Sequence, residues 1–258
     1  MGNRMEGKVA IVTGASSGIG RATAVRLAEE GAQVSVAARR AERLESLVRE
    51  IESAGGKALA VETDVADRDS VRNAVSKTVE AFGRLDVAVN NAASIGPIGS
   101  IADLSYEDWR SLMAVNLDGA FHCMQAQIGA MRQSGGGSIV NVGSVNSFIG
   151  APMATTYVTS KHALLGLSRS AGAELAPENI RVNIVCPGLV QTEMQDTIAD
   201  ILTGGEPEGF ENPFLSRTPQ GRLADPREIA HTILWLASDE SSFVTGSALT
   251  VDGGVMAG

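Results

Sequence analysis

The sequence contains only two cysteines among its 258 residues, Cys123 and Cys186. Each lies in an apolar stretch, and neither belongs to a CxxC or Cys/His pattern with metal-ligand spacing. Two isolated cysteines exclude a disulfide framework, so we expect both to be small core residues in a reducing compartment. No metal site is predicted.

Positive charge is also scarce, since 21 lysines and arginines face 30 acidic residues and the formal net charge is −9. A field of this sign repels nucleic-acid phosphates and anionic membrane surfaces, so neither is a predicted partner. The first residues lack a long apolar run, because the charged segment 1–7 leads directly into the short apolar run 9–12. We therefore expect a cytoplasmic protein.

No low-complexity tract interrupts the chain, and its length suits a single domain over residues 1–258. Short β-branched runs predict seven strands, at 9–12, 33–37, 58–61, 87–90, 138–142, 181–185 and 248–251. Amphipathic helices are predicted between them, at 18–30, 41–54, 67–82, 105–132, 155–175 and 226–237. This alternation predicts an α/β fold, a doubly wound parallel sheet of seven strands with helices on both faces, whose ligands bind at the carboxyl ends of the strands.

One stretch departs from this alternation. From residue 188 to 225 about 38 residues pass without a predicted strand, which exceeds the usual loop length. We expect a substrate lid at about 189–225, with short helices near 192–202 and 210–215. A surface loop without function would give the same pattern.

The first predicted strand runs into the glycine-rich turn Thr13-Gly14-Ala15-Ser16-Ser17-Gly18-Ile19-Gly20, and a helix follows. Glycines at such a turn let a diphosphate approach the helix N-terminus, where free N–H groups favour anions. The candidate dinucleotide ligands in this turn are Gly14, Ser16, Ser17 and Ile19. The alternative is that the glycines serve the turn for steric reasons alone.

The residue type at the end of the second strand predicts which of the two dinucleotides, NAD or NADP, is bound. An acid there holds the ribose 2′-hydroxyl of NAD, whereas an arginine accommodates the 2′-phosphate of NADP. The run Val36-Ala37-Ala38-Arg39-Arg40 contains no acid. We expect NADP, bound through Arg39 with help from Arg40. NAD is the alternative cofactor if both arginines are only solvated residues at a helix start.

Tyr157 and Lys161 are four residues apart, a spacing that places both side chains on one helix face. A free phenol has a pKa of about 10. A positive charge about 4 Å away contributes about 4 kcal/mol at an effective dielectric of about 20, or roughly three pKa units before desolvation. Unless the spacing is accidental, the pair predicts an acid-base group whose pKa is lowered toward the working pH.

With these motifs in place, the chain resembles the short-chain dehydrogenase/reductase family over nearly its whole length. The shared motifs also include Asp64-Val65, Asn90-Asn91-Ala92, Asn116, Ser144 and Pro187-Gly188 followed by Thr192. Ala93 departs from the family, which commonly has glycine there. The resemblance implies a Rossmann-type fold, a homotetramer and an oxidoreductase that acts on carbonyl or secondary-alcohol groups.

By this resemblance, Tyr157 is the catalytic acid-base, and Lys161 lowers its pKa and holds the nicotinamide ribose. Ser144 binds the substrate oxygen, and Asn116 supports a water chain that relays protons. Alternatively, Ser144 is a turn serine and Asn116 a buried structural amide. The resemblance further assigns cofactor contacts to Asp64, Val65, Asn91, Val190 and Thr192.

We therefore expect an NAD(P)(H)-dependent enzyme that transfers a hydride between nicotinamide and the carbonyl or carbinol carbon of a small, largely apolar ketone or alcohol. The residues expected around the cleft are mostly apolar, namely Ser94, Ile95, Val145, Asn146, Phe148, Met153, Leu189, Met194, Phe210 and Phe214. The alternative substrate is a 3-oxoacyl thioester on acyl carrier protein, whose acidic carrier the net charge disfavours. A dinucleotide sensor without chemistry is disfavoured by the intact Ser144, Tyr157 and Lys161.

Overall fold

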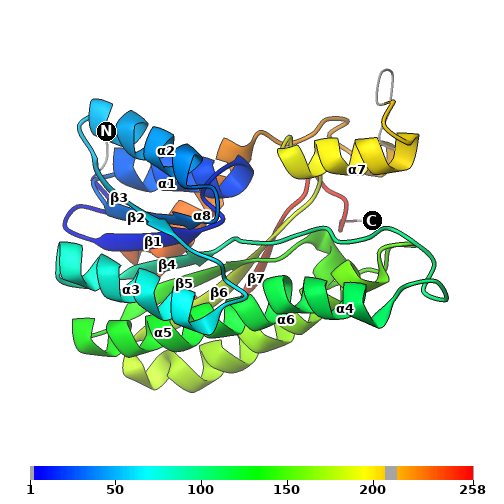
Figure 1. Cartoon of the computed structure of the whole chain (residues 1–258). Helices are drawn as coiled ribbons and strands as arrows, with labels where there is room; N and C mark the ends of the chain where they lie inside the picture. The colour runs from blue at the N-terminus through cyan, green and yellow to red at the C-terminus, as the bar shows by residue number, and fades with distance from the viewer. Residues whose placement is uncertain (1–2, 207–213, 258) are drawn as a thin grey trace.

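The computed structural model describes residues 3–206 and 214–257. Its strands are β1 (Val9–Thr13), β2 (Gln33–Ala38), β3 (Lys57–Glu62), β4 (Val87–Asn90), β5 (Gly137–Val142), β6 (Ile180–Pro187) and β7 (Ala248–Val251). They form one parallel sheet in the order β3-β2-β1-β4-β5-β6-β7 (Figure 1). Because β1 pairs with both β2 and β4, the strand order reverses at β1. The predicted doubly wound α/β fold is confirmed.

Helices cover both faces of the sheet (Figure 1). One face carries α1 (Gly18–Glu29), α2 (Ala41–Ser53) and α8 (Pro226–Ala237), and the other carries α3 (Arg68–Phe82), α5 (Gly119–Ser134) and α6 (Thr155–Leu175). Each face has its own apolar core, built around residues such as Leu27, Leu44 and Ile233 on the first and Met131 and Leu175 on the second. The central strands β1 and β4 are buried throughout, which explains their continuous apolar runs.

Two of the predicted helices begin at residues whose side chains cap the helix. Ser105 Oγ accepts a hydrogen bond from the N–H of Asp108 at 3.0 Å, at the start of α4 (Tyr106–Met113). Asp225 and Glu228 form a reciprocal capping box at the start of α8. Caps of this kind contribute about 1 kcal/mol each to helix stability, so these boundaries are fixed locally by the sequence.

The helix predicted over 105–132 is present, but it is not a regular α-helix throughout. After α4 the chain makes a π-helical turn over Ala114–Asp118 and then enters α5. Asn116 lies in the middle of this turn and is buried. A π turn inserts one extra residue into a helix and is often found at functional sites. The extent of this helical segment was therefore predicted from the sequence, but the π turn at a candidate site residue was not.

The segment after β6 contains the helix α7 (Glu193–Thr203), as predicted near 192–202. Its two ends are fixed together by a parallel bridge between Val190 and Ala224, because the Ala224 N–H donates to Leu189 O and the Gln191 N–H to Ala224 O, both at 2.9 Å. The predicted helix near 210–215 and Phe210 fall mostly outside the described residues. Among the residues that are described, no helix has the length and apolarity of a membrane span.

Candidate active site

The glycine-rich turn joins β1 to α1 at the carboxyl edge of the sheet. The Asn91 amide donates to the carbonyl oxygens of Thr13 and Gly14 at 3.1 and 3.2 Å. Gly14 has a φ of +65°, and a Cβ there would lie 2.7 Å from Asn91 Nδ2. A Cβ on Gly20 would lie 2.4 Å from the Gly14 carbonyl oxygen. The packing of the turn itself therefore requires these two glycines, whether or not a ligand binds.

A cavity of about 240 Å³ opens beside this turn. Its lining includes most of the predicted cofactor residues, namely Gly14, Ser16, Ser17, Ile19, Arg39, Asp64, Val65, Asn91 and Thr192. The other three, Val190, Tyr157 and Lys161, are buried and do not line it. Strand ends far apart in the sequence thus meet at one groove, where the strand order reverses.

Arg40, the predicted helper, makes the contacts with the turn. Its guanidinium donates to Ser16 Oγ at 2.8 and 3.1 Å and to Ser17 Oγ at 2.9 Å. It also donates to Glu193 Oε2 at 2.9 Å. Arg39 lines the cavity and enters no ion pair with any described residue. The idea that both arginines are only solvated is therefore wrong for Arg40.

Ser144, Tyr157 and Lys161 are buried together at the carboxyl end of β5. Ser144 Oγ accepts a hydrogen bond from the N–H of Asn146 at 3.2 Å, so this hydroxyl also caps a short turn. Lys161 Nζ donates to the Val142 carbonyl oxygen at 2.9 Å and lies 5.5 Å from the centroid of the Tyr157 ring. The predicted placement of Tyr157 and Lys161 on one face of a helix is observed on α6.

The pKa of Tyr157 departs from its ordinary value in the direction opposite to our prediction. Burial raises it to about 12, although hydrogen bonding with Ser144 acts to lower it. Burial also lowers the pKa of Lys161 to about 8. The physical reason is that a buried phenolate loses its hydration, while the ammonium is bound to a backbone carbonyl rather than to the phenol oxygen. At neutral pH the phenol is therefore protonated.

Asn116 joins two segments that flank the site. Its Oδ1 accepts the Ser94 N–H at 2.8 Å, and its Nδ2 donates to Ser94 O at 2.9 Å and to Ser160 Oγ at 3.2 Å. Ser160 Oγ in turn donates to the Tyr157 carbonyl oxygen at 2.7 Å. Both amide hydrogens of Asn116 are used within the protein. This arrangement supports a structural role for the amide, because both of its hydrogens hold neighbouring segments together; one lone pair of Oδ1 is still available to a water molecule.

The chain is similar in sequence and in structure to known proteins. A family model described as enoyl-(acyl carrier protein) reductase matches residues 14–256. The chain is 43% identical over 253 residues to a 3-oxoacyl-[acyl-carrier-protein] reductase of Thermotoga maritima, with 98% of this chain and 99% of that protein covered. It is 39% identical over 253 residues to a cyclohexanol dehydrogenase of Acinetobacter sp., with 98% and 96% covered. The chain belongs to the short-chain dehydrogenase/reductase family. The crystal structure of levodione reductase matches this family member with a TM-score of 0.95 at 32% identity, over 98% of this chain and 99% of that one.

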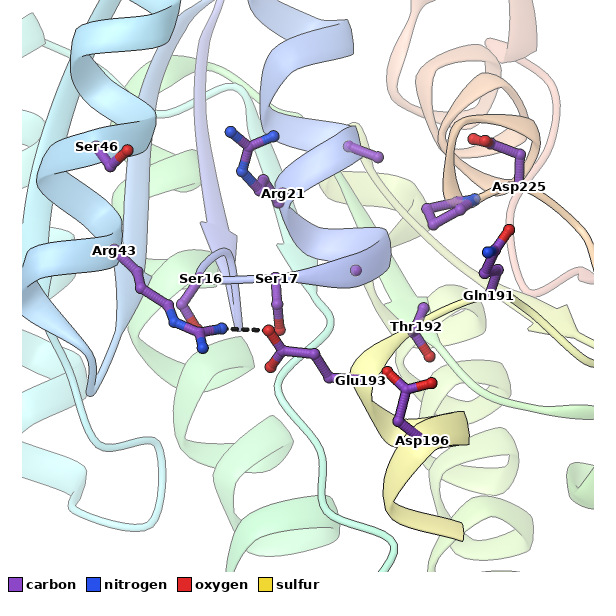
Figure 2. Close-up of a pocket in the computed structure, with 13 residues that line it drawn as sticks. Ser16, Ser17, Arg21, Arg43, Ser46, Gln191, Thr192, Glu193, Asp196 and Asp225 are labelled. Carbon is purple, nitrogen blue, oxygen red and sulfur yellow. Dashed lines mark hydrogen bonds and ion pairs between the residues drawn. The ribbon is translucent and has the colours of Figure 1, made fainter. Parts of the chain in front are cut away.

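Two residues of this short-chain dehydrogenase/reductase were not anticipated from the sequence. Glu193, the first residue of α7, pairs with Arg43 of α2 (Figure 2). It also pairs with Arg40. An acid in the first turn of a helix is ordinarily explained by the helix dipole, and an arginine on an amphipathic helix by solvation. Arg43 and Glu193 are 150 residues apart, so only the fold brings them together.

Proposed function

We propose that this short-chain dehydrogenase/reductase is an NADP-preferring enzyme that interconverts a ketone and a secondary alcohol in a small, largely apolar substrate. The observation that carries the proposal is the joint burial of Ser144, Tyr157 and Lys161 at the same sheet edge as the glycine-rich turn. Burial of an ammonium and a phenol is costly for stability, and such groups are concentrated at sites where protons move. A binding module without chemistry would have no need of them.

The glycine-rich turn fits the diphosphate of a dinucleotide. Ser17 caps α1 without a side-chain hydrogen bond, and no described residue accepts a hydrogen bond from the N–H groups of Gly18 or Ile19. Free N–H groups at a helix N-terminus bind anions. In the proposed complex this turn, with Gly14 and Ser16, holds the diphosphate.

The remaining cofactor contacts are proposed from the lining of the same groove. Asp64 and Val65 would hold the adenine, and Arg39 with Arg40 the 2′-phosphate of NADP. Asn91 holds the turn, as its hydrogen bonds to Thr13 and Gly14 indicate. The nicotinamide end is assigned to Lys161, Val190 and Thr192. The absence of an acid directly after β2 supports NADP over NAD.

When bound, the nicotinamide supplies or accepts the hydride. Tyr157 is protonated at neutral pH, so it can donate its proton to a substrate oxygen on which negative charge develops. Ser144 donates a second hydrogen bond to that oxygen. Lys161 is positively charged below a pH of about 8 and stabilises the phenolate that remains on Tyr157.

A 3-oxoacyl thioester on acyl carrier protein is the second candidate substrate. The relative named as a 3-oxoacyl-[acyl-carrier-protein] reductase, at 43% identity, favours it. A net charge of −9 disfavours the approach of an acidic carrier, and the similarity to a cyclohexanol dehydrogenase supports a small alicyclic substrate instead. Turnover of a cyclic ketone and of a 3-oxoacyl thioester, compared at equal concentration, separates the two candidates.

We further propose that the whole chain is one domain in which residues 189–225 form a lid that carries α7. The Val190–Ala224 bridge supports this proposal, because it fixes both ends of the segment beside the groove. A homotetramer is supported by large apolar side chains left exposed on the described surface, namely Ile101, Phe121 and Phe243. Light scattering tests the tetramer, and a monomer at every concentration would contradict it.

The decisive experiment replaces Tyr157 by Phe and compares turnover of a ketone panel with NADPH and NADH. The loss of the proton donor should reduce kcat by about 10³-fold or more, while the dissociation constant for the dinucleotide stays within about twofold of the wild type. Tyr106, the only other tyrosine, lies exposed on α4 and provides the matched control. Tyr106→Phe should retain full activity. Turnover that persists in Tyr157→Phe would remove Tyr157 from the mechanism.

A further inference from the structure

Glu193 lies between two arginines at the edge of the cofactor groove. Its Oε2 accepts a hydrogen bond from Arg40 Nη1 at 2.9 Å. Its Oε1 pairs with Arg43 Nη1, as Figure 2 shows. The Arg40 guanidinium also donates to the hydroxyls of Ser16 and Ser17. Two guanidinium groups therefore converge on a single carboxylate, and one of them also binds two hydroxyls of the glycine-rich turn.

This set of donors is better matched to a phosphate than to a carboxylate. A phosphate monoester carries up to two negative charges and three acceptor oxygens, and arginines bind it through paired hydrogen bonds. Arg40 and Arg43 together carry two positive charges, of which Glu193 balances one. Hydrogen bonds from Arg40 and then from Arg43 hold the pKa of Glu193 below its usual value, so this carboxylate is charged at neutral pH.

The position of Glu193 also relates it to the dinucleotide. It lines the cofactor cavity of about 240 Å³ together with Arg39 and Arg40. It also lines a second, more open cavity of about 650 Å³ on the outer side of the glycine-rich turn, which is drawn in Figure 2. Glu193 thus lies at the boundary of the groove, where its ion pairs with Arg40 and Arg43 connect α7 to the start of α2.

We propose that Glu193 is a specificity-determining residue, whose carboxylate competes with the ribose 2′-phosphate of the dinucleotide for Arg40 and Arg43. This inference rests on the proposed dinucleotide-dependent function. A ligand with a 2′-phosphate must displace the carboxylate from the arginines, whereas a ligand with a free 2′-hydroxyl leaves the ion pairs intact. Glu193 therefore reduces the preference for NADP that the arginines provide, and Arg43 becomes a phosphate ligand when Glu193 is displaced.

The test replaces Glu193 by Gln and measures dissociation constants by calorimetry, without any turnover. The probes are adenosine 2′,5′-bisphosphate and adenosine 5′-monophosphate, which differ only in the 2′-phosphate. Arg40, Arg43 and Glu193 have side chains 44%, 48% and 50% exposed, so their pairing has the modest strength of surface ion pairs. We expect the bisphosphate to bind about fivefold more tightly to Glu193→Gln, equivalent to about 1 kcal/mol, and the monophosphate to change by less than about twofold.

Asp196→Asn is the matched control, because it removes one negative charge from α7 at a side chain that has no hydrogen bond or ion pair within the described residues. It should leave the ratio of the two dissociation constants unchanged. In a background with both Arg40→Gln and Arg43→Gln, Glu193→Gln should lose most of its selective effect, since both contested guanidinium groups are absent. Equal tightening of both ligands in Glu193→Gln, or the same selective tightening in Asp196→Asn, would overturn the inference.

The experiment also separates this inference from the proposed function. If the wild type binds NADP, NAD and both adenosine nucleotides but Glu193→Gln leaves their ratio unchanged, the proposed function stands and Glu193 has no role in selectivity. If the wild type binds none of these nucleotides, the proposed function fails, and the inference fails with it.

Discussion

Replacement of Asn116 by Ala tests whether this residue acts through structure or through a water chain. The change removes three hydrogen bonds, at 2.8, 2.9 and 3.2 Å, from a buried side chain. At about 1 kcal/mol for each bond, less about 0.7 kcal/mol for the better helix propensity of alanine, the free energy of unfolding should fall by about 2 kcal/mol. For a chain of this size the midpoint of thermal unfolding should fall by about 4–8 °C at fixed protein concentration.

Turnover should fall together with stability, because Ser160 connects Asn116 to the backbone of Tyr157 and Ser94 leads the loop after β4. Asn73→Ala is the control, since Asn73 is an exposed amide on α3 and its loss should change the melting temperature by no more than about 2 °C. A residue that only relays protons through water would give a different result. If Asn116→Ala melts with the wild type and still loses turnover, the structural assignment is wrong.

Two further changes test the electrostatics and the turn. In Lys161→Met the buried ammonium is lost. Because burial lowers the pKa of Lys161 from 10.5 to about 8, the unfolded chain binds more protons between these values. Urea titrations at several pH values would give the unfolding free energy of the wild type and of Lys161→Met. The difference between the two should therefore rise in favour of the wild type between pH 8 and 10.5, by at most about 3 kcal/mol. A difference that does not change with pH would contradict the shifted pKa of Lys161. Gly14→Ala should lower stability by about 1–3 kcal/mol, because the position has a φ of +65° and its Cβ would meet Asn91. Gly129→Ala, on α5 with open space around its Cβ, should instead stabilise the protein slightly, and equal melting of the two variants would refute the steric requirement at Gly14.

The sheet was predictable because its strands carry a strong local signal. β1 and β4 are buried on both faces, so their sequences are nearly uninterrupted apolar runs bounded by polar turns. The predicted ends differ from the observed ends by two residues at most, as at β6, which continues to Pro187. The spacing of Tyr157 and Lys161 was equally informative, because a four-residue separation fixes relative direction on any helix.

The π turn could not be predicted in the same way. A single extra residue shifts the apolar period of a helix too little to be seen against the irregularity of natural sequences. What holds the turn is a set of hydrogen bonds from Asn116 to Ser94 and Ser160, which lie 22 and 44 residues away. Contacts at that separation are known only once the fold is known. The same limit applies to Arg40, whose partner Glu193 is 153 residues away.

The pKa of Tyr157 shows where a sequence argument based on charge fails. Attraction to Lys161 and loss of hydration act in opposite directions, and each can amount to several pKa units, so their difference depends on atomic positions. In the structure, Lys161 Nζ is 5.5 Å from the ring centroid and bound to Val142 O, and burial prevails. A protonated Tyr157 is the form that reduction of a carbonyl requires, whereas oxidation of an alcohol requires the phenolate. In the proposed mechanism, the site as it stands is therefore prepared for reduction at neutral pH, and oxidation gains only as the pH rises toward the raised pKa of this phenol.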